Sequence, residues 1–471
     1  MEVWEGDACS LVEAFRAGTI TPPEALELSL QAIDRSSLNA FCYVDSEGAG
    51  RAAESADVSL PFGGVPIGVK ELDPVTGWPY SEASLVFAGR TAGYTSTMVE
   101  RLVGSGGAVP IGQTTASEFG GVNYTHTRIH GTTCNPWNLE RTPGGSSGGT
   151  AAGVAGGLMT LGTAGDGGGS IRIPAGFTGM FGLKATFGRI PRGPRVMHPP
   201  LTVTSGCVSR SVRDTARWFD VCNGFDAQDT LSLPRVSGWE AGLGTLRDSL
   251  VGRRCATSID LGSAVVSRRV SDVVLAAAEA LIADAGMKRV DLVVQFPEAT
   301  LAWVTSNLVT LRAELGELYP GCEADLTPEV QFAMNIADHT FNLQMAGENE
   351  NFRVELNETM ASLFDEVDFI FCSTNPDVAF AAAGPMPTTI DGEDLMEKVG
   401  FERALGNNGA LTMPANLAGN PAISVPAGFV DGLPVGMQVI GHHHSEQLLL
   451  ELAAIAEAER PWPLVAPGAP L

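Results

Sequence analysis

Apolar residues recur along the chain with two different spacings, which predict helices that alternate with short buried strands. Leu26 and Ile33 share one helical face, and Thr21, followed by two prolines and Glu24, fits a capping box with proline in the first turn. Residues 8–36 are therefore predicted as a pair of helices. Compact apolar runs predict strands at residues 40–44, 65–69, 108–111 and 368–372.

The second half of the chain is predicted to be richer in helix. Val270, Val274 and Leu281 fall on one face of a helix within residues 264–285. Strands alternating with helices are typical of an α/β fold. No internal repeat, low-complexity tract or Ser/Pro linker divides the chain, so the simplest organisation is one domain with an inserted helical region. Further helices are predicted at residues 301–318, 328–363 and 445–458.

The composition indicates which binding partners and which cellular compartment to expect. The 471 residues carry a formal net charge of -25, which disfavours nucleic acid and anionic membrane surfaces as partners. The eight cysteines form no CxxC pair and indicate free thiols of a reducing compartment. No signal peptide is visible, and the most apolar run, residues 151–164, is too short to span a bilayer. A cytoplasmic protein is expected.

A glycine-rich stretch at residues 143–174 carries the candidate chemistry. Glycine clusters allow tight bends and bring backbone N–H groups close to a ligand. Ser170 follows three glycines, so its hydroxyl stands beside free backbone donors, as a serine nucleophile with an oxyanion hole requires. No glycine lies two positions after Ser170 and no lysine follows Gly149, which argues against a nucleophile elbow and a phosphate-binding loop.

Two segments of this stretch, GGSSGG at residues 144–149 and GGSIRIP at residues 168–174, resemble the amidase signature enzymes. The resemblance implies the amidase signature fold: an α/β fold whose central mixed, twisted β-sheet is covered by helices on both faces, with a helical variable region. It implies a single amidase domain over residues 1–471. Within it we expect a signature core at about 62–195, a variable substrate-shaping region at about 225–365 and a C-terminal core segment at about 366–460.

The resemblance also implies a catalytic triad of Lys70, Ser146 and Ser170. Lys70 ends an apolar strand, where desolvation would lower its pKa toward that of a usable base, and no neighbouring acid is expected. Glu71 should point to the opposite face of the strand. Ser170 is the expected nucleophile, and Ser146, preceded by a cis peptide bond in the family, is expected to relay its proton to Lys70. The expected oxyanion hole consists of the backbone N–H groups of Gly167, Gly168, Gly169 and Ser170.

Other residues near the triad receive supporting roles. Gly120 and Gly121 lie in a loop that similar enzymes place against the substrate, so they are predicted to bind it. Gly167 stands where the family usually has a larger residue, which makes the turn more flexible. No cofactor and no metal are assigned, because the three adjacent histidines at 442–444 lack the spacing of a metal site. Candidates for holding the triad in place are Ser147, Thr150, Asp166 and Arg172.

The predicted function is that of an amidase: a serine hydrolase that cleaves C–N bonds through an acyl-enzyme. Because the variable region has no recognisable basic cluster, we expect neutral, partly apolar amides, anilides or carbamates (urethanes), with esters as a further class, rather than a carboxylate-bearing substrate. A monomer or homodimer is expected. The alternative is the amidase subunit of a tRNA-dependent glutamine amidotransferase, which works with a partner that binds tRNA.

Overall fold

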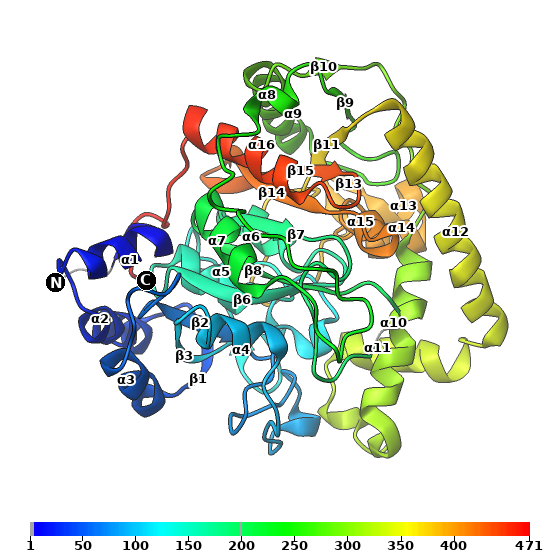
Figure 1. The fold of residues 1–471 in the computed structure, drawn as a ribbon. Helices are drawn as coiled ribbons and strands as arrows, with labels where there is room; N and C mark the ends of the chain where they lie inside the picture. Colours follow the sequence, from blue (N-terminus) through cyan, green and yellow to red (C-terminus); the bar gives the residue numbers. More distant parts are fainter. Residues whose placement is uncertain (1–3, 198–199) are drawn as a thin grey trace.

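One large mixed sheet forms the centre of the molecule. The computed structural model describes residues 4–197 and 200–471. Its eleven-stranded sheet consists of β1 Phe41–Val44, β2 Pro66–Lys70, β3 Val109–Thr114, β6 Leu161–Asp166, β7 Phe181–Lys184, β8 Thr204–Ser209, β9 Arg254–Thr257, β10 Lys288–Arg289, β11 Phe369–Ser373, β14 Ala422–Val430 and β15 Leu433–Gly441. The strand order is β1-β3-β2-β6-β8-β7-β14-β15-β11-β9-β10 (Figure 1). The pairs β2–β3, β2–β6, β9–β11 and β9–β10 are parallel and the remaining pairs are antiparallel, so the predicted mixed sheet is confirmed.

Helices cover both faces of the sheet, as the α/β prediction requires (Figure 1). One face packs against α1 Ala8–Arg16, α4 Thr97–Val103, α7 Val212–Cys222, α9 Arg268–Asp284 and α16 Glu446–Glu459. The other face packs against α2 Pro22–Arg35, α3 Ser46–Glu54, α5 Gly148–Ala155, α6 Arg172–Thr178, α12 Leu343–Glu366 and α15 Met413–Ala418. The remaining α-helices are α8 Arg247–Leu250, α10 Thr300–Leu315, α11 Pro328–His339, α13 Leu395–Val399 and α14 Phe401–Gly406, and the remaining strands form the small ribbons β4 His126–Thr127 with β5 Gly131–Thr132 and β12 Thr389–Ile390 with β13 Glu393–Asp394.

The strand β11 shows how the sequence divides its side chains between the two faces. Successive side chains of a strand point to opposite sides. Phe369 and Phe371 pack into the cluster under α9 and α16, whereas Ile370 and Cys372 pack into the cluster under α12 and α15. The continuous apolar run of this strand therefore reflects burial on both faces, which is typical of a sheet covered on two sides.

Two helix predictions have different outcomes. The predicted pair at residues 8–36 is confirmed as α1 and α2, and the Thr21–Glu24 capping box is present. The single helix predicted at residues 328–363 is wrong, because α11 ends at His339 and α12 begins after Asn342. The Asn342 side chain accepts a hydrogen bond from the Met345 N–H and starts a new helix. None of the described helices has the length and apolar character needed to cross a membrane.

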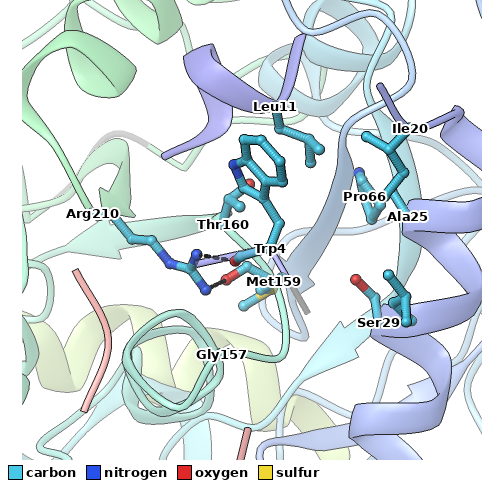
Figure 2. Close-up of a pocket in the computed structure, with 11 residues that line it drawn as sticks. Trp4, Leu11, Ile20, Ala25, Ser29, Pro66, Gly157, Met159, Thr160 and Arg210 are labelled. Atoms are coloured by element: carbon cyan, nitrogen blue, oxygen red, sulfur yellow. Dashed lines mark hydrogen bonds between the residues drawn. The ribbon is translucent and has the colours of Figure 1, made fainter. Parts of the chain in front are cut away.

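A small recess lies under Trp4, at the start of β2 (Figure 2). The buried Arg210 guanidinium closes one side of it and donates to the carbonyl oxygens of Trp4 at 2.6 Å and Met159 at 3.0 Å. Pro66, at the opposite end of β2 from Lys70, lines the recess. These bonds join the N-terminal segment to the loop before β6, so we interpret the recess as a packing feature.

Candidate active site

The end of β2 directs Lys70 toward the serines that precede α5. Val65, Ile67 and Val69 pack into the cluster under α4 and α7, so the alternation of the strand turns Lys70 to the other face. There the Lys70 Nζ donates to Ser146 Oγ at 2.7 Å and to Ser147 Oγ at 2.9 Å, and the lysine side chain is buried. The structure thus brings together two residues that are 76 positions apart in the chain.

The surroundings of Lys70 lower its pKa. Burial lowers the pKa of Lys70 to about 8, although the carboxylates of Asp73, Asp166 and Glu71 oppose this shift. The expectation that no acid lies near Lys70 was wrong. Asp73 accepts a hydrogen bond from Thr163 Oγ1, which in turn accepts one from the Lys70 backbone N–H. Desolvation nevertheless outweighs these charges, since the pKa falls below the usual value.

The Glu71 carboxylate forms hydrogen bonds with groups other than Lys70. Its Oε1 accepts a hydrogen bond from the Ala116 N–H at 2.6 Å, and its Oε2 lies 2.8 Å from His130 Nε2. With Cys42 these side chains form a set in the described chain whose ligand atoms lie within 4.8 Å of one another, close enough to hold a metal ion. No sequence pattern indicated this set, because its members come from three separate segments.

The serines that face Lys70 lie where a loop and a helix meet closely. The peptide bond Gly145–Ser146 is cis. A Cβ added to Gly149 would lie 2.4 Å from the Thr115 backbone nitrogen, so only glycine allows this approach. A Cβ on Gly120 would lie 3.4 Å from Ser146 Oγ, whereas one on Gly121 would meet only the Glu118 carbonyl oxygen. Gly120 therefore borders the site, and Gly121 has no such contact with it.

Ser170 lies in the turn between β6 and α6, and Asp166 accepts hydrogen bonds from the backbone of this turn. Asp166 Oδ1 accepts from the Gly169 N–H at 2.8 Å, and Oδ2 accepts from the Ile171 and Arg172 N–H groups at 3.2 and 3.4 Å. The Gly169 N–H is thus already used, which removes it from the expected oxyanion hole. In the described chain, the N–H groups of Gly168 and Ser170 have no hydrogen-bond partner.

Two of the three adjacent histidines at 442–444 are hydrogen-bonded to other parts of the chain. His443 Nε2 lies 2.9 Å from the Ala418 carbonyl oxygen, and His444 Nδ1 lies 3.3 Å from a nitrogen of Arg189. The His443 and His444 side chains are thus both used in hydrogen bonds. Thr150, a supporting candidate, is hydrogen-bonded beside the strand that carries Lys70. Its Oγ1 lies 2.7 Å from Thr114 Oγ1 and donates to the Thr163 carbonyl oxygen at 2.9 Å.

The chain as a whole matches known proteins. The Amidase family model matches residues 24–450. The chain belongs to the amidase signature family. An acylamidase from Rhodococcus erythropolis is 31% identical over 478 residues, covering 97% of this chain and 95% of the relative. A glutamyl-tRNA(Gln) amidotransferase subunit from Lacticaseibacillus paracasei is 29% identical over 502 residues, covering 99% of this chain and 100% of the relative. The solved structure of a bacterial aryl acylamidase that belongs to the same family is 27% identical, with a TM-score of 0.87, covering 98% of this chain and 97% of that chain.

In this amidase, a buried ionic network supports the turn that carries Ser170. Arg172 donates to Asp166 through Nε at 3.0 Å and Nη2 at 2.9 Å, and both side chains are fully buried. Burial alone would raise the pKa of Asp166, but the Arg172 guanidinium and its hydrogen bonds hold that pKa well below its usual value. Arg172 also donates to Gln438 and Asn416, each at 2.6 Å. Sequence reasoning named Asp166 and Arg172 as candidates without pairing them, and it missed the two amides, which lie more than 240 positions away.

Replacing Asp166 with asparagine should destabilise this amidase and slow its chemistry. The variant leaves the Arg172 charge buried without its carboxylate partner, which costs about 3–5 kcal/mol in comparable sites. Urea unfolding should show the loss of stability. Glu459→Gln is the matched control, because its pair with Arg247 is half exposed and should contribute about 1 kcal/mol or less. Equal stability losses in the two variants would contradict a special role for the Asp166–Arg172 network.

Proposed function

We propose that this amidase is a serine hydrolase that cleaves amides through Lys70, Ser146 and Ser170. The observation that carries the proposal is the 2.7 Å hydrogen bond from Lys70 Nζ to Ser146 Oγ. It joins a buried lysine, whose pKa is lowered to about 8, to a serine hydroxyl that can pass a proton. Ser170, at the turn ordered by Asp166, supplies the attacking oxygen.

The proposed reaction runs in two halves. Neutral Lys70 accepts the proton of Ser146, and Ser146 accepts the proton of Ser170, whose Oγ attacks the carbonyl carbon. Hydrogen bonds from the N–H groups of Gly168 and Ser170, with Gly167 as a further proposed donor, stabilise the oxyanion. Ser146 then gives its proton to the leaving amine and takes one back from Lys70, which becomes neutral again. Water, deprotonated by the same relay, attacks the acyl-enzyme, and Ser170 leaves with the proton that Ser146 returns to it.

We propose neutral, partly apolar amides, anilides or carbamates as substrates. In helices α10 to α12 the basic side chains other than His339 are Arg312 and Arg353. Arg312 pairs with Asp338 at 3.6 Å, and Arg353 donates to two backbone carbonyl oxygens at 2.5 Å. Neither arginine is left to recognise a carboxylate. The name of the acylamidase relative supports amides as substrates.

The helices of the variable region contact the loop that includes Gly120, which supports a role for them in shaping the substrate site. Glu118 Oε2 accepts hydrogen bonds from the Thr327 N–H and hydroxyl at 2.8 and 2.6 Å. Tyr124 donates to Glu329 at 2.5 Å. The start of α11 is therefore fixed to this loop, and Gly120 borders Ser146.

We also propose that residues 1–471 form a single amidase domain. Strands from residues 41–209 and from residues 254–441 belong to the same sheet, which supports this organisation. The signature core at about 62–195 and the C-terminal segment at about 366–460 would then form one body. The variable region at about 225–365 would cover the site formed by that body.

A panel of chromogenic anilides, esters, carbamates and glutamine tests the proposed substrate class. We expect the isolated chain to hydrolyse at least one neutral anilide or carbamate with a kcat/KM at least about tenfold above that for glutamine, because no free cation is available in α10 to α12 to bind the carboxylate. Absorbance of the released chromophore, or released ammonia for glutamine, measures product formation. Preference for glutamine would contradict the proposal.

A second candidate function is that of a glutamine amidotransferase subunit, and the relative that is 29% identical over 99% of the chain favours it. An obligate subunit should be poorly active alone and should gain activity with its partners. Gel filtration combined with the substrate panel separates the two candidates. Full activity of the isolated chain on anilides would favour the free amidase.

A further inference from the structure

The peptide groups that precede Ser170 are each held by a hydrogen bond to the carbonyl oxygen. Trp303 Nε1 donates to the Gly167 carbonyl oxygen at 2.7 Å. The next two carbonyls have one distant and one nearby partner. The Gly168 carbonyl oxygen accepts from Thr412 Oγ1 at 2.5 Å, and the Gly169 carbonyl oxygen accepts from the Ile173 N–H at 2.7 Å.

The direction of one carbonyl fixes the direction of the following N–H. In a trans peptide group the C=O and N–H bonds point to opposite sides of the chain. The Gly167–Gly168 bond is not among the cis bonds of the chain. Because Trp303 holds the Gly167 carbonyl on its own side, the Gly168 N–H points away from the indole. This N–H has no hydrogen-bond partner in the part of the chain that the structure describes.

The local sequence leaves this peptide without other restraints. Gly167 and Gly168 both lack a Cβ, so steric barriers do little to stop the peptide group from flipping. A flip would turn the Gly167 carbonyl toward the oxyanion and remove the donor. The Gly169 N–H does not compensate, because it donates to Asp166.

Trp303 is packed closely enough to provide the missing restraint. A Cβ added to Gly168 would lie 2.7–2.9 Å from three atoms of the indole, so the ring lies against the glycine backbone. The indole is half-buried and packs against the cluster under α12 and α15. It comes from α10, in the segment predicted to shape the substrate site, and is 136 positions from Gly167.

We propose that Trp303 is a positioning residue that keeps the Gly168 N–H directed at the oxyanion. This inference rests on the proposed serine hydrolase function, because it needs a negatively charged oxygen at that point. It predicts that Trp303 acts on the transition state: the loss of its N–H lowers kcat and leaves KM nearly unchanged.

The test removes the indole N–H while keeping an aromatic ring. Trp303→Phe should lower kcat on an anilide by about tenfold to a hundredfold, less than the loss of a whole oxyanion donor. The rate at which a fluorophosphonate labels the variant, and the affinity of the variant for a trifluoromethyl ketone, should fall by a similar factor. Trp239→Phe is the matched control. It also removes an indole bond to a backbone carbonyl, that of Val236 at 2.8 Å, but in the core beside α7.

The outcomes separate this inference from the proposed function. A wild-type chain that neither hydrolyses an amide nor reacts with the fluorophosphonate overturns the serine hydrolase itself and, with it, the role of Trp303. If the wild type is active and the folded Trp303→Phe variant reacts as fast as Trp239→Phe, only the role of Trp303 is overturned. If Trp303→Phe does not fold, replacement of Trp303 by 3-benzothienylalanine, in which sulfur takes the place of the N–H, decides the question by the same measurements.

Discussion

Ser170→Ala is expected to abolish hydrolysis, with a loss of about 10⁴-fold or more in kcat, because the variant lacks the oxygen that forms the acyl-enzyme. Ser170 is nearly buried, and its side chain appears in none of the hydrogen bonds that order the turn. The fold should therefore survive, and the thermal unfolding midpoint should stay close to that of the wild type. Steady-state assays on an anilide and labelling with a fluorophosphonate measure the two effects.

A serine-to-alanine change elsewhere provides the control for Ser170. The Ser445 hydroxyl donates to the His442 carbonyl oxygen at the start of α16, outside the proposed relay. Ser445→Ala should retain both turnover and labelling. Turnover by a folded Ser170→Ala variant at the wild-type rate would remove the proposed mechanism.

Lys70 should act as a neutral base, so the rate should rise from acid to mildly alkaline pH. Burial lowers the pKa of Lys70 to about 8, so the protonated form dominates below this pH and the active neutral form dominates above it. We expect kcat/KM to increase through a midpoint near that value. Lys70→Ala should lower the rate by orders of magnitude, and Lys70→Arg should not restore it, because arginine stays protonated.

Lys184 offers a matched control for the pH profile. It is the other buried lysine, and burial lowers its pKa to about 7. Its Nζ donates to the carbonyl oxygens of Ala185 and Asn420, away from the proposed relay. Lys184→Met should reduce thermal stability and leave the midpoint of the rate profile in place. A profile that is flat between about pH 5 and about pH 9, or an active Lys70→Arg variant, would show that another group deprotonates Ser146.

Local patterns were sufficient to predict much of the fold. The capping box at Thr21 marked the start of α2, and the apolar run before Lys70 marked β2, because caps and strand alternation depend on neighbouring residues. The two glycine–serine segments identified the family and the residues to examine. Glu71, which the sequence analysis did not pair with Lys70, bonds to Ala116 and His130 instead.

Long-range contacts could not be predicted in the same way. Trp303 reaches Gly167 from a segment whose position relative to the turn no local pattern reveals. Asp73 approaches Lys70 through Thr163, on a neighbouring strand. The break between α11 and α12 at Asn342 has a local signal, since asparagine is a frequent helix cap. It was missed because the helical spacing of apolar residues continues on both sides.

The division of the sheet between two parts of the chain has a consequence for biosynthesis. The ribosome makes Lys70, Ser146 and Ser170 early. Asn416 and Gln438, whose side-chain amides accept hydrogen bonds from Arg172, are made near the end. Until Asn416 and Gln438 have been synthesised, Arg172 in the nascent chain lacks two of its hydrogen-bond partners. The turn that carries Ser170 is then incompletely supported. We therefore expect a ribosome-bound chain that stops before residue 412 to be inert toward amides, so that translation itself delays the onset of activity until the last strands have been added.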